Sequence, residues 1–173
     1  MVLPPAKVRA GVFAGLADSK ALSALARDGL HALLLREADV GLGWATEAEI
    51  DHLNILQASL LAMRRALAAL ATPAELALID GDKIPPDLNL PARALVGGDA
   101  RVLSIAAASV VAKVERDRLM ERLDDRYPGY GWARNKGYPT REHRTALLSL
   151  GPTPHHRRSF APVRAAMKDA GSA

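Results

Sequence analysis

The strongest constraint on the fold is an alternation of long helical and short apolar segments in the middle of the chain. A helix is predicted over about 54–70, because apolar residues recur at spacings of four and three, at Leu56, Leu60, Met63, Leu67 and Leu70. Glu75–Ile79 and Ala92–Val96 are short apolar runs bounded by Pro and Gly, which is typical of buried strands. A second long helix is predicted over Ser104–Arg126. This order indicates an α/β domain with helices flanking a sheet.

The remaining segments extend this pattern on both sides. Helical periodicity covers Ser23–Arg36, and Val40–Ala45 is a candidate strand. Thr46 and Glu49 have the spacing of a capping box and predict a helix start. Tyr127–Thr140 is expected to be a loop broken by Gly and Pro, and Arg141–Leu150 a short helix. We therefore expect an α/β domain over 1–126 and a helical, basic C-terminal appendage over 127–173.

Positive charge is concentrated in the last quarter of the chain. The whole sequence of 173 residues has a net charge of +4, whereas residues 131–173 contain eight Lys or Arg and only two acidic residues. Such a segment is suited to lie along a polyphosphate. A solvated basic tail without a ligand is the other interpretation that composition leaves open.

Composition also indicates where the protein works. The chain has no cysteine, which is consistent with a reducing compartment. Its N-terminus lacks the basic and apolar regions of a signal peptide, and no apolar run approaches the roughly 20 residues of a membrane helix. We expect a cytoplasmic monomer.

Asp80 and Asp99 are the candidate catalytic carboxylates. Each follows a predicted strand, Asp80 directly and Asp99 after Gly97-Gly98. Sites in open α/β sheets gather at the carboxyl ends of strands, and two neighbouring carboxylates repel one another unless a cation binds them. Oxygen ligands and a phosphate substrate suit Mg²⁺ or Mn²⁺. Because Asp beside Gly also commonly opens a turn, the residues alone leave both interpretations open.

Tyr138 is the candidate for substrate recognition. In the segment NKGYPT it stands between Gly137 and Pro139, which restrict its backbone. An aromatic face can stack on a sugar or base, and the adjacent Lys136 can reach a phosphate. A tyrosine that only anchors the loop is the alternative.

Several of these segments together resemble a known family. The stretch RVLSIAAASVVAKVERDRLMERLDDRYPGYGWARNKGYPTREHR, followed by TALLSLGPTPHHRRSFAPV, is similar to the C-terminal half of ribonuclease HII, the bacterial type 2 ribonuclease H. The segments GLADSKALS, with Asp18-Ser19-Lys20, and IDHLNILQA, over 50–58, match as well. The motifs occur in the family's order from about Val2 to Val163.

The resemblance implies both a fold and an activity. The fold would be an RNase H-like mixed sheet flanked by helices, with a basic helical C-terminal appendage. The activity would be that of a metal-dependent endonuclease, which hydrolyses the RNA strand of RNA–DNA hybrids and incises DNA at single embedded ribonucleotides. Its partners would be hybrid duplex and DNA containing ribonucleotides, and its cofactor Mn²⁺ or Mg²⁺.

The resemblance also assigns roles to residues. Asp80 and Asp99 match metal-binding aspartates, and Tyr138 matches a tyrosine that senses the junction between ribonucleotide and deoxyribonucleotide. The candidate substrate contacts are Lys136, Lys113, Arg157 and Arg158. His156 stands beside the two arginines in HHRRSFAPV, and these three residues suit contact with a nucleic-acid backbone, with a solvated terminal patch as the alternative. Asp82 is interpreted as a loop residue. Asp117 is interpreted either as a member of a helix-surface ion pair or as a catalytic group.

The family pattern contains an upstream part that this sequence lacks. The family has a strand with adjacent Asp and Glu and a Gly-Arg-Gly turn that reads the 2′-hydroxyl, and neither motif occurs here. Two of four metal-binding carboxylates would then be missing, so we expect the activity of the chain as given to be impaired. One hypothesis is a start codon assigned too far downstream. The alternative function is a non-catalytic nucleic-acid-binding remnant of the same fold.

Overall fold

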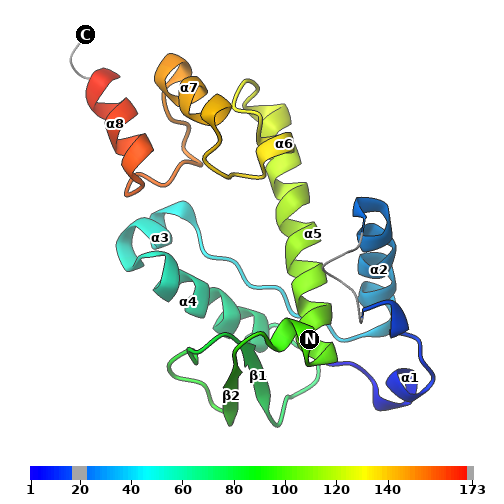
Figure 1. The fold of residues 1–173 in the computed structure, drawn as a ribbon. Coiled ribbons are helices and arrows are strands. Elements are labelled where there is room, and N and C mark those ends of the chain that lie inside the picture. The colour runs from blue at the N-terminus through cyan, green and yellow to red at the C-terminus, as the bar shows by residue number, and fades with distance from the viewer. Residues whose placement is uncertain (17–22, 171–173) are drawn as a thin grey trace. The chain divides into compact units, whose positions relative to one another are not determined.

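The computed structural model describes residues 1–16 and 23–170, which form two compact units (Figure 1). Unit 1 consists of Met1–Trp44 and Ser59–Val114, and unit 2 of Ala45–Ala58 and Glu115–Ala173. The helices α4 (Ile55–Ala68) and α5 (Leu103–Arg126) contribute residues to both units. The division into domains at residues 126 and 127 stays a prediction. Asp18-Ser19-Lys20 lies outside the described residues.

Unit 1 contains a small parallel sheet. Strands β1 (Ala77–Asp80) and β2 (Ala92–Leu95) pair in parallel, with Ala77 opposite Ala92 and Asp80 opposite Leu95. Both predicted strands are thus confirmed, with their ends shifted by one or two residues.

The sequence predicts a mixed sheet, with both parallel and antiparallel strands. Within residues 1–16 and 23–170, the two strands of the sheet are parallel. Antiparallel pairing is limited there to one isolated bridge between Val2 and Asp39. Pro4 and Pro5 follow Val2 and have no N–H to continue a ladder.

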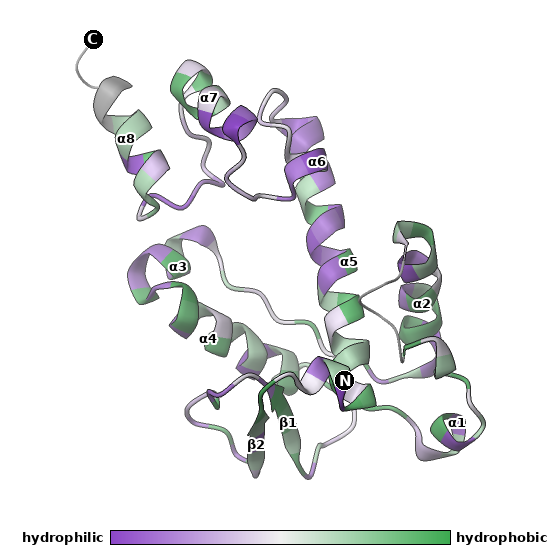
Figure 2. Cartoon of the chain, in the orientation of Figure 1, coloured by the Kyte–Doolittle hydropathy of each residue, from purple (hydrophilic) through white to green (hydrophobic). Residues whose placement is uncertain are grey.

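Helices surround a hydrophobic core in unit 1. The helices α2 (Ala24–Glu37) and the first part of α5 contribute to this core, whereas α1 (Pro5–Arg9) has no buried residue. The buried core residues are Phe13, Leu16, Leu34, Ala107, Val110 and Val111. The first turns of α5 are more hydrophobic than its later turns (Figure 2), as expected for a segment that enters a core and then reaches the surface. The predicted helices over 23–36 and 104–126 are confirmed.

The segment Val40–Ala45 is not a strand, contrary to the expectation. It forms no ladder, and the reason lies in its two glycines. A Cβ at Gly41 would lie 2.0 Å from the carbonyl oxygen of Ala66, and one at Gly43 would lie 2.1 Å from that of Ala62. The segment therefore packs directly against the backbone of α4, an approach that only glycine allows.

Unit 2 is helical. The capping box is confirmed: the Thr46 hydroxyl accepts from the Glu49 N–H, the Glu49 carboxylate accepts from the Thr46 N–H, and α3 (Glu47–Leu53) begins there. The predicted loop 127–140 contains one helical turn, α6 (Trp132–Asn135), which the sequence pattern did not predict. The chain continues with α7 (Arg141–Leu150), as predicted, and α8 (Ala161–Ala170).

The core of unit 2 is separate from that of unit 1. It contains Met120, Leu123, Tyr130, Trp132, Ala146, Leu147, Val163 and Ala166. No helix within residues 1–16 and 23–170 combines the length and apolar character needed to span a membrane.

We predict that Gly43→Ala destabilises the protein by about 1–3 kcal/mol, because the added methyl group must displace the α4 backbone. The matched control is Gly29→Ala in the exposed interior of α2, where a Cβ meets no atom within 4 Å. This control should raise the free energy of unfolding by about 0.5–1 kcal/mol. Urea unfolding followed by circular dichroism measures both changes. Equal stabilities of Gly43→Ala and the unchanged protein would contradict the close packing of this segment.

Candidate functional site

Asp80 and Asp99 lie at the carboxyl end of the two-stranded sheet in unit 1. Asp80 is the last residue of β1, and Asp99 lies on the short 3-10 helix η2 (Gly98–Ala100) that follows β2. The Asp80 Oδ1 atom accepts a hydrogen bond from the Gly98 N–H at 2.9 Å. Because that N–H belongs to the residue next to Asp99, the contact ties the two segments together. The Asp80 side chain is exposed, and that of Asp99 is half-buried.

Gly98 lets the turn after β2 pack closely against Ile105 at the start of α5, and Asp80 lies at an ordinary contact distance. A Cβ on Gly98 would lie 2.6 Å from Ile105 Cδ1 and 3.5 Å from Asp80 Oδ1. The preceding Gly97 has φ 65°, in the left-handed region that favours glycine. The Gly97-Gly98 pair thus lets the chain turn sharply and carry Asp99 back to the end of the sheet.

This arrangement fits part of the coordination shell of a hard divalent cation. The carboxylates offer oxygen ligands, which Mg²⁺ and Mn²⁺ prefer, and the bond from Gly98 occupies only one oxygen of Asp80. The described part of the chain contains no cluster of three or more His, Asp or Glu residues that could hold a metal. If a metal binds here, Asp80 and Asp99 would supply two ligands rather than a complete site.

The other polar candidates lie in the loop after β1 and on α5. Asp82 is exposed and its carboxylate lies 3.2 Å from the Lys83 ammonium, as expected for a loop residue. Lys113 and Asp117 are half-buried on α5.

Tyr138 and Lys136 lie on the turn after α6, in unit 2. The Tyr138 side chain is 66% exposed, so it is presented to solvent and does not anchor the loop in the core. Lys136 ends α6 with φ 50°. Its ammonium lies 2.6 Å from a Glu121 carboxylate oxygen, and its side chain is only 20% exposed. A phosphate contact by Lys136 therefore requires exchange of this ion pair.

The arginine pair of the tail is held through its backbone. The Asp51 carboxylate on α3 accepts from the Arg158 N–H at 2.8 Å, the Ser159 N–H at 2.8 Å and the Ser159 hydroxyl at 2.6 Å. Burial opposes ionisation of Asp51, but these hydrogen bonds outweigh it and keep its pKa below the ordinary value. The Arg157 guanidinium lies 5.0 Å from the centre of the Phe160 ring, a cation–π geometry.

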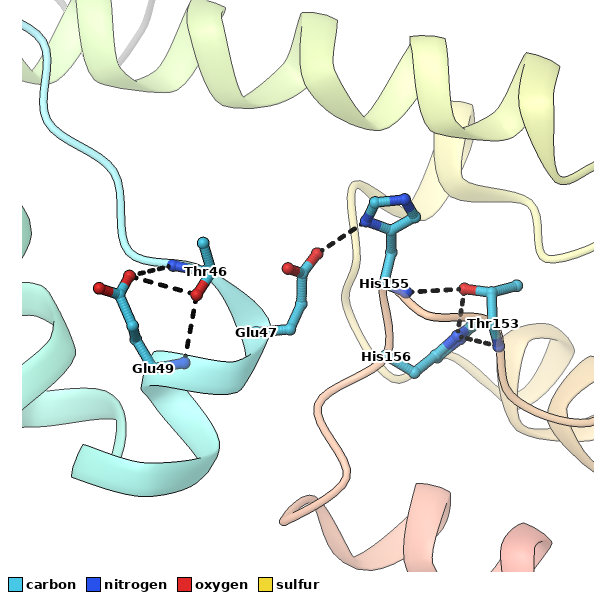
Figure 3. A network of polar contacts seen from close by, with 6 residues as sticks. All are labelled: Thr46, Glu47, Glu49, Thr153, His155 and His156. Atoms are coloured by element: carbon cyan, nitrogen blue, oxygen red, sulfur yellow. Dashed lines mark hydrogen bonds and ion pairs between the residues drawn. The ribbon is translucent and has the colours of Figure 1, made fainter.

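His156 is a core residue, contrary to the interpretation that it contacts a nucleic-acid backbone. It is 7% exposed, and its ring lies within about 5 Å of the rings of Tyr130, Trp132 and His143. The Thr153 N–H donates to His156 Nδ1 at 3.0 Å (Figure 3), so the ring proton is on Nε2. Burial, together with the neighbouring His143, lowers the pKa of His156 to about 4.

The adjacent His155 links the tail to α3. Its Nδ1 lies 3.0 Å from the Glu47 carboxylate (Figure 3), and its ring makes an edge contact with Tyr127. With the bonds of Asp51, this contact holds the segment that carries Arg157 and Arg158 against α3.

The chain is similar to ribonuclease HII over most of its length. The family model for ribonuclease HII matches residues 10–163. Ribonuclease HII of Jannaschia sp. (strain CCS1) is 58% identical over 149 residues, which is 86% of this chain and 75% of that protein. Ribonuclease HII of Rhodospirillum rubrum is 55% identical over 169 residues, which is 96% of this chain and 77% of that protein.

The chain belongs to the ribonuclease HII family. Members of this family are endoribonucleases that cleave RNA in RNA–DNA hybrids and use divalent metal ions, and the chain shares that activity.

A solved structure shows the likeness in fold. The crystal structure of the ribonuclease H2 from Pyrococcus horikoshii OT3 matches with a TM-score of 0.75 at 23% identity, and the match covers 99% of this chain and 89% of that one. The backbone therefore has a ribonuclease H2-like fold.

The sequence pattern did not predict two residues of unit 2 that support candidate substrate contacts. Asp51 holds the arginine pair, and Asn135 makes buried hydrogen bonds beside Tyr138. Asp51 lies within a matched segment, but its partners are more than 100 residues away in sequence. Asn135 could have been noticed as the polar residue before a Lys-Gly turn, because Asn commonly bonds to the backbone two residues on.

We predict that protein stability falls as the pH drops from about 6.5 toward 4. In the unfolded chain His156 takes up a proton near the ordinary histidine pKa of 6.5, whereas in the folded chain it does so only near 4. Between these values the unfolded state binds more protons, so the free energy of unfolding decreases with falling pH. Above about pH 6.5, His156 is neutral in both states and adds nothing to the pH dependence of the free energy of unfolding.

Urea unfolding at a series of pH values measures this dependence. His156→Asn is the comparison, because an amide oxygen can still accept from the Thr153 N–H but cannot titrate. It should flatten the slope between pH 4 and 6.5. An unchanged slope in this variant would show that another group is responsible.

Proposed function

We propose that the chain incises DNA at single embedded ribonucleotides, in addition to cleaving RNA in hybrids, by two-metal phosphodiester hydrolysis in which Asp80 and Asp99 supply two of the metal ligands. The observation that carries this proposal is the placement of both carboxylates at the carboxyl end of β1 and β2, with the Gly98 N–H bonded to Asp80. In a member of the ribonuclease HII family, this is where oxygen ligands for a phosphate-handling cation are expected.

The two aspartates would hold Mn²⁺ or Mg²⁺ as catalytic metal ligands. Bound there, the ions supply an activated water and stabilise the charge on the leaving oxygen. The Gly98 N–H orients the Asp80 carboxylate by holding Oδ1, and Oδ2 would be the oxygen that ligates a cation. The half-buried position of Asp99 limits the orientations of its carboxylate.

Substrate contacts are proposed for Tyr138, Lys136, Lys113, Arg157 and Arg158. The exposed Tyr138 ring can stack on a sugar or base. Lysine and arginine contacts to phosphates position a duplex without reading its sequence. Because such substrates lie with the bacterial chromosome, the proposed location is the cytoplasm, and we propose a monomer as the working state.

We predict that Asp80→Asn weakens Mn²⁺ binding and metal-dependent cleavage. Loss of a residue that only supports a metal ligand typically costs 10–100-fold in affinity or activity, so loss of a ligand should cost at least about 100-fold. Hybrid binding should persist, because the proposed phosphate contacts are other residues. The matched control is Asp82→Asn in the adjacent loop, which removes an exposed carboxylate of the same size and charge.

Calorimetric titration with Mn²⁺ and incision of a duplex containing one ribonucleotide are the two measurements. Equal Mn²⁺ affinities for Asp80→Asn and Asp82→Asn would remove Asp80 from the site. Hybrid binding by the unchanged chain without metal-dependent cleavage would identify the non-catalytic alternative.

We predict that Arg157→Gln and Arg158→Gln each reduce the salt dependence of hybrid binding. Each phosphate contact contributes about 0.9 to the slope of log affinity against log salt on B-form duplex, so each variant should lower the slope by roughly that amount. Arg36→Gln on α2 is the control, because Arg36 is an exposed arginine outside the tail. Fluorescence anisotropy at several KCl concentrations measures the slopes. A slope lowered equally by Arg36→Gln would show that net charge, rather than the arginine pair, determines binding.

A further inference from the structure

The turn that carries Tyr138 has a strained backbone. Lys136 and Gly137 both have positive φ, 50° and 82°. The left-handed region costs little for glycine but is unfavourable for lysine, whose Cβ crowds the following carbonyl. Such a conformation persists only where its surroundings impose it.

Asn135 imposes this conformation through three hydrogen bonds. Its Nδ2 donates to the Tyr130 carbonyl at 2.8 Å, its Oδ1 accepts from the Gly137 N–H at 2.9 Å, and its backbone carbonyl accepts from the Tyr138 N–H at 2.8 Å. The orientation of the amide follows from these partners, since a carbonyl only accepts and an N–H only donates. The side chain is 8% exposed, so water offers little replacement for these bonds.

The anchor of Asn135 is itself fixed in the core of unit 2. The Tyr130 carbonyl also lies 3.1 Å from His143 Nδ1, which must donate to it. The Tyr130 ring stacks on Trp132 with centroids 5.1 Å apart. The turn is therefore tied at Asn135 to a rigid cluster, while Tyr138 extends to solvent.

We propose that Asn135 is a positioning residue for ribonucleotide recognition and acts through Tyr138. The amide holds the turn in the left-handed conformation that presents the Tyr138 ring in one orientation. Without it, the relaxation of Lys136 and Gly137 leaves the ring mobile, and discrimination between a ribonucleotide junction and plain DNA is lost. This inference rests on the proposed function of Tyr138.

The test compares the affinities for two duplexes of the same sequence, one with a single ribonucleotide and one of DNA alone. The discrimination ratio is the Kd for the DNA duplex divided by the Kd for the duplex with the ribonucleotide. Tyr138→Ala should lower this ratio by about tenfold, as loss of one stacked base does, and Asn135→Ala should lower it by a similar factor. The Kd for the DNA duplex should change little.

The double variant separates positioning from a general structural role. If Asn135 acts through Tyr138, Asn135→Ala lowers the ratio no further in the Tyr138→Ala background. The control is Tyr130→Phe, which removes the hydroxyl bond to Gly151 in the same core but leaves the Tyr130 carbonyl in place. It should keep the ratio of the unchanged protein.

A second variant disturbs the turn without removing the Asn135 amide. In Gly137→Ala a Cβ would lie 2.9 Å from Met120 Sδ, at a φ of 82°. Gly137→Ala should also lower the discrimination ratio, so the inference can still be tested if Asn135→Ala fails to fold. Circular dichroism identifies the folded variants.

Three results would overturn the inference while leaving the role of Tyr138 intact. The first is a normal ratio in folded Asn135→Ala or Gly137→Ala with a reduced ratio in Tyr138→Ala. The second is additive losses in the double variant, and the third is an equal loss in Tyr130→Phe. If Tyr138→Ala itself keeps the ratio of the unchanged protein, the proposed function of Tyr138 fails and the inference fails with it.

Discussion

Helix α5 is the element on which both hydrophobic cores depend. Its first turns provide Ala107, Val110 and Val111 to the core of unit 1, and its later turns provide Met120 and Leu123 to the core of unit 2. A single helix can contribute to two cores only if no residue breaks it between them. The sequence 103–126 contains neither Gly nor Pro, which removes the two residues most damaging to a helix interior.

Polar side chains that bind backbone N–H groups hold the candidate functional loops. Asp80 binds the N–H of Gly98, Asp51 those of Arg158 and Ser159, and Asn135 that of Gly137. Each bond satisfies a donor that a loop cannot pair in a helix or strand. In this chain such side chains hold the loops that carry Asp99, the arginine pair and Tyr138. The proposed chemistry thus depends on short polar contacts at the ends of elements more than on the elements themselves.

Periodicity and local motifs predicted most of the elements. The apolar repeat over 54–70, the Thr46–Glu49 capping box and the run after Ser104 each correspond to a helix, because their signals act within a few residues. The segment Val40–Ala45 was predicted wrongly because its glycines serve contact with α4, which lies later in the sequence. The single turn α6 was missed because its four residues carry no periodicity.

The sequence by itself determined the family, the helices α2 to α5 and α7, and the candidate carboxylates Asp80 and Asp99, since motif order and apolar spacing are properties of the chain alone. Only the tertiary structure decided that His156 lies in a core, that Lys136 is paired with Glu121, and that Asn135 and Asp51 support the candidate binding residues. These facts depend on partners far apart in sequence or on burial. Neither can be read from residue type, because the same His or Lys is favourable in water and in a suitable pocket, and only packing selects between them.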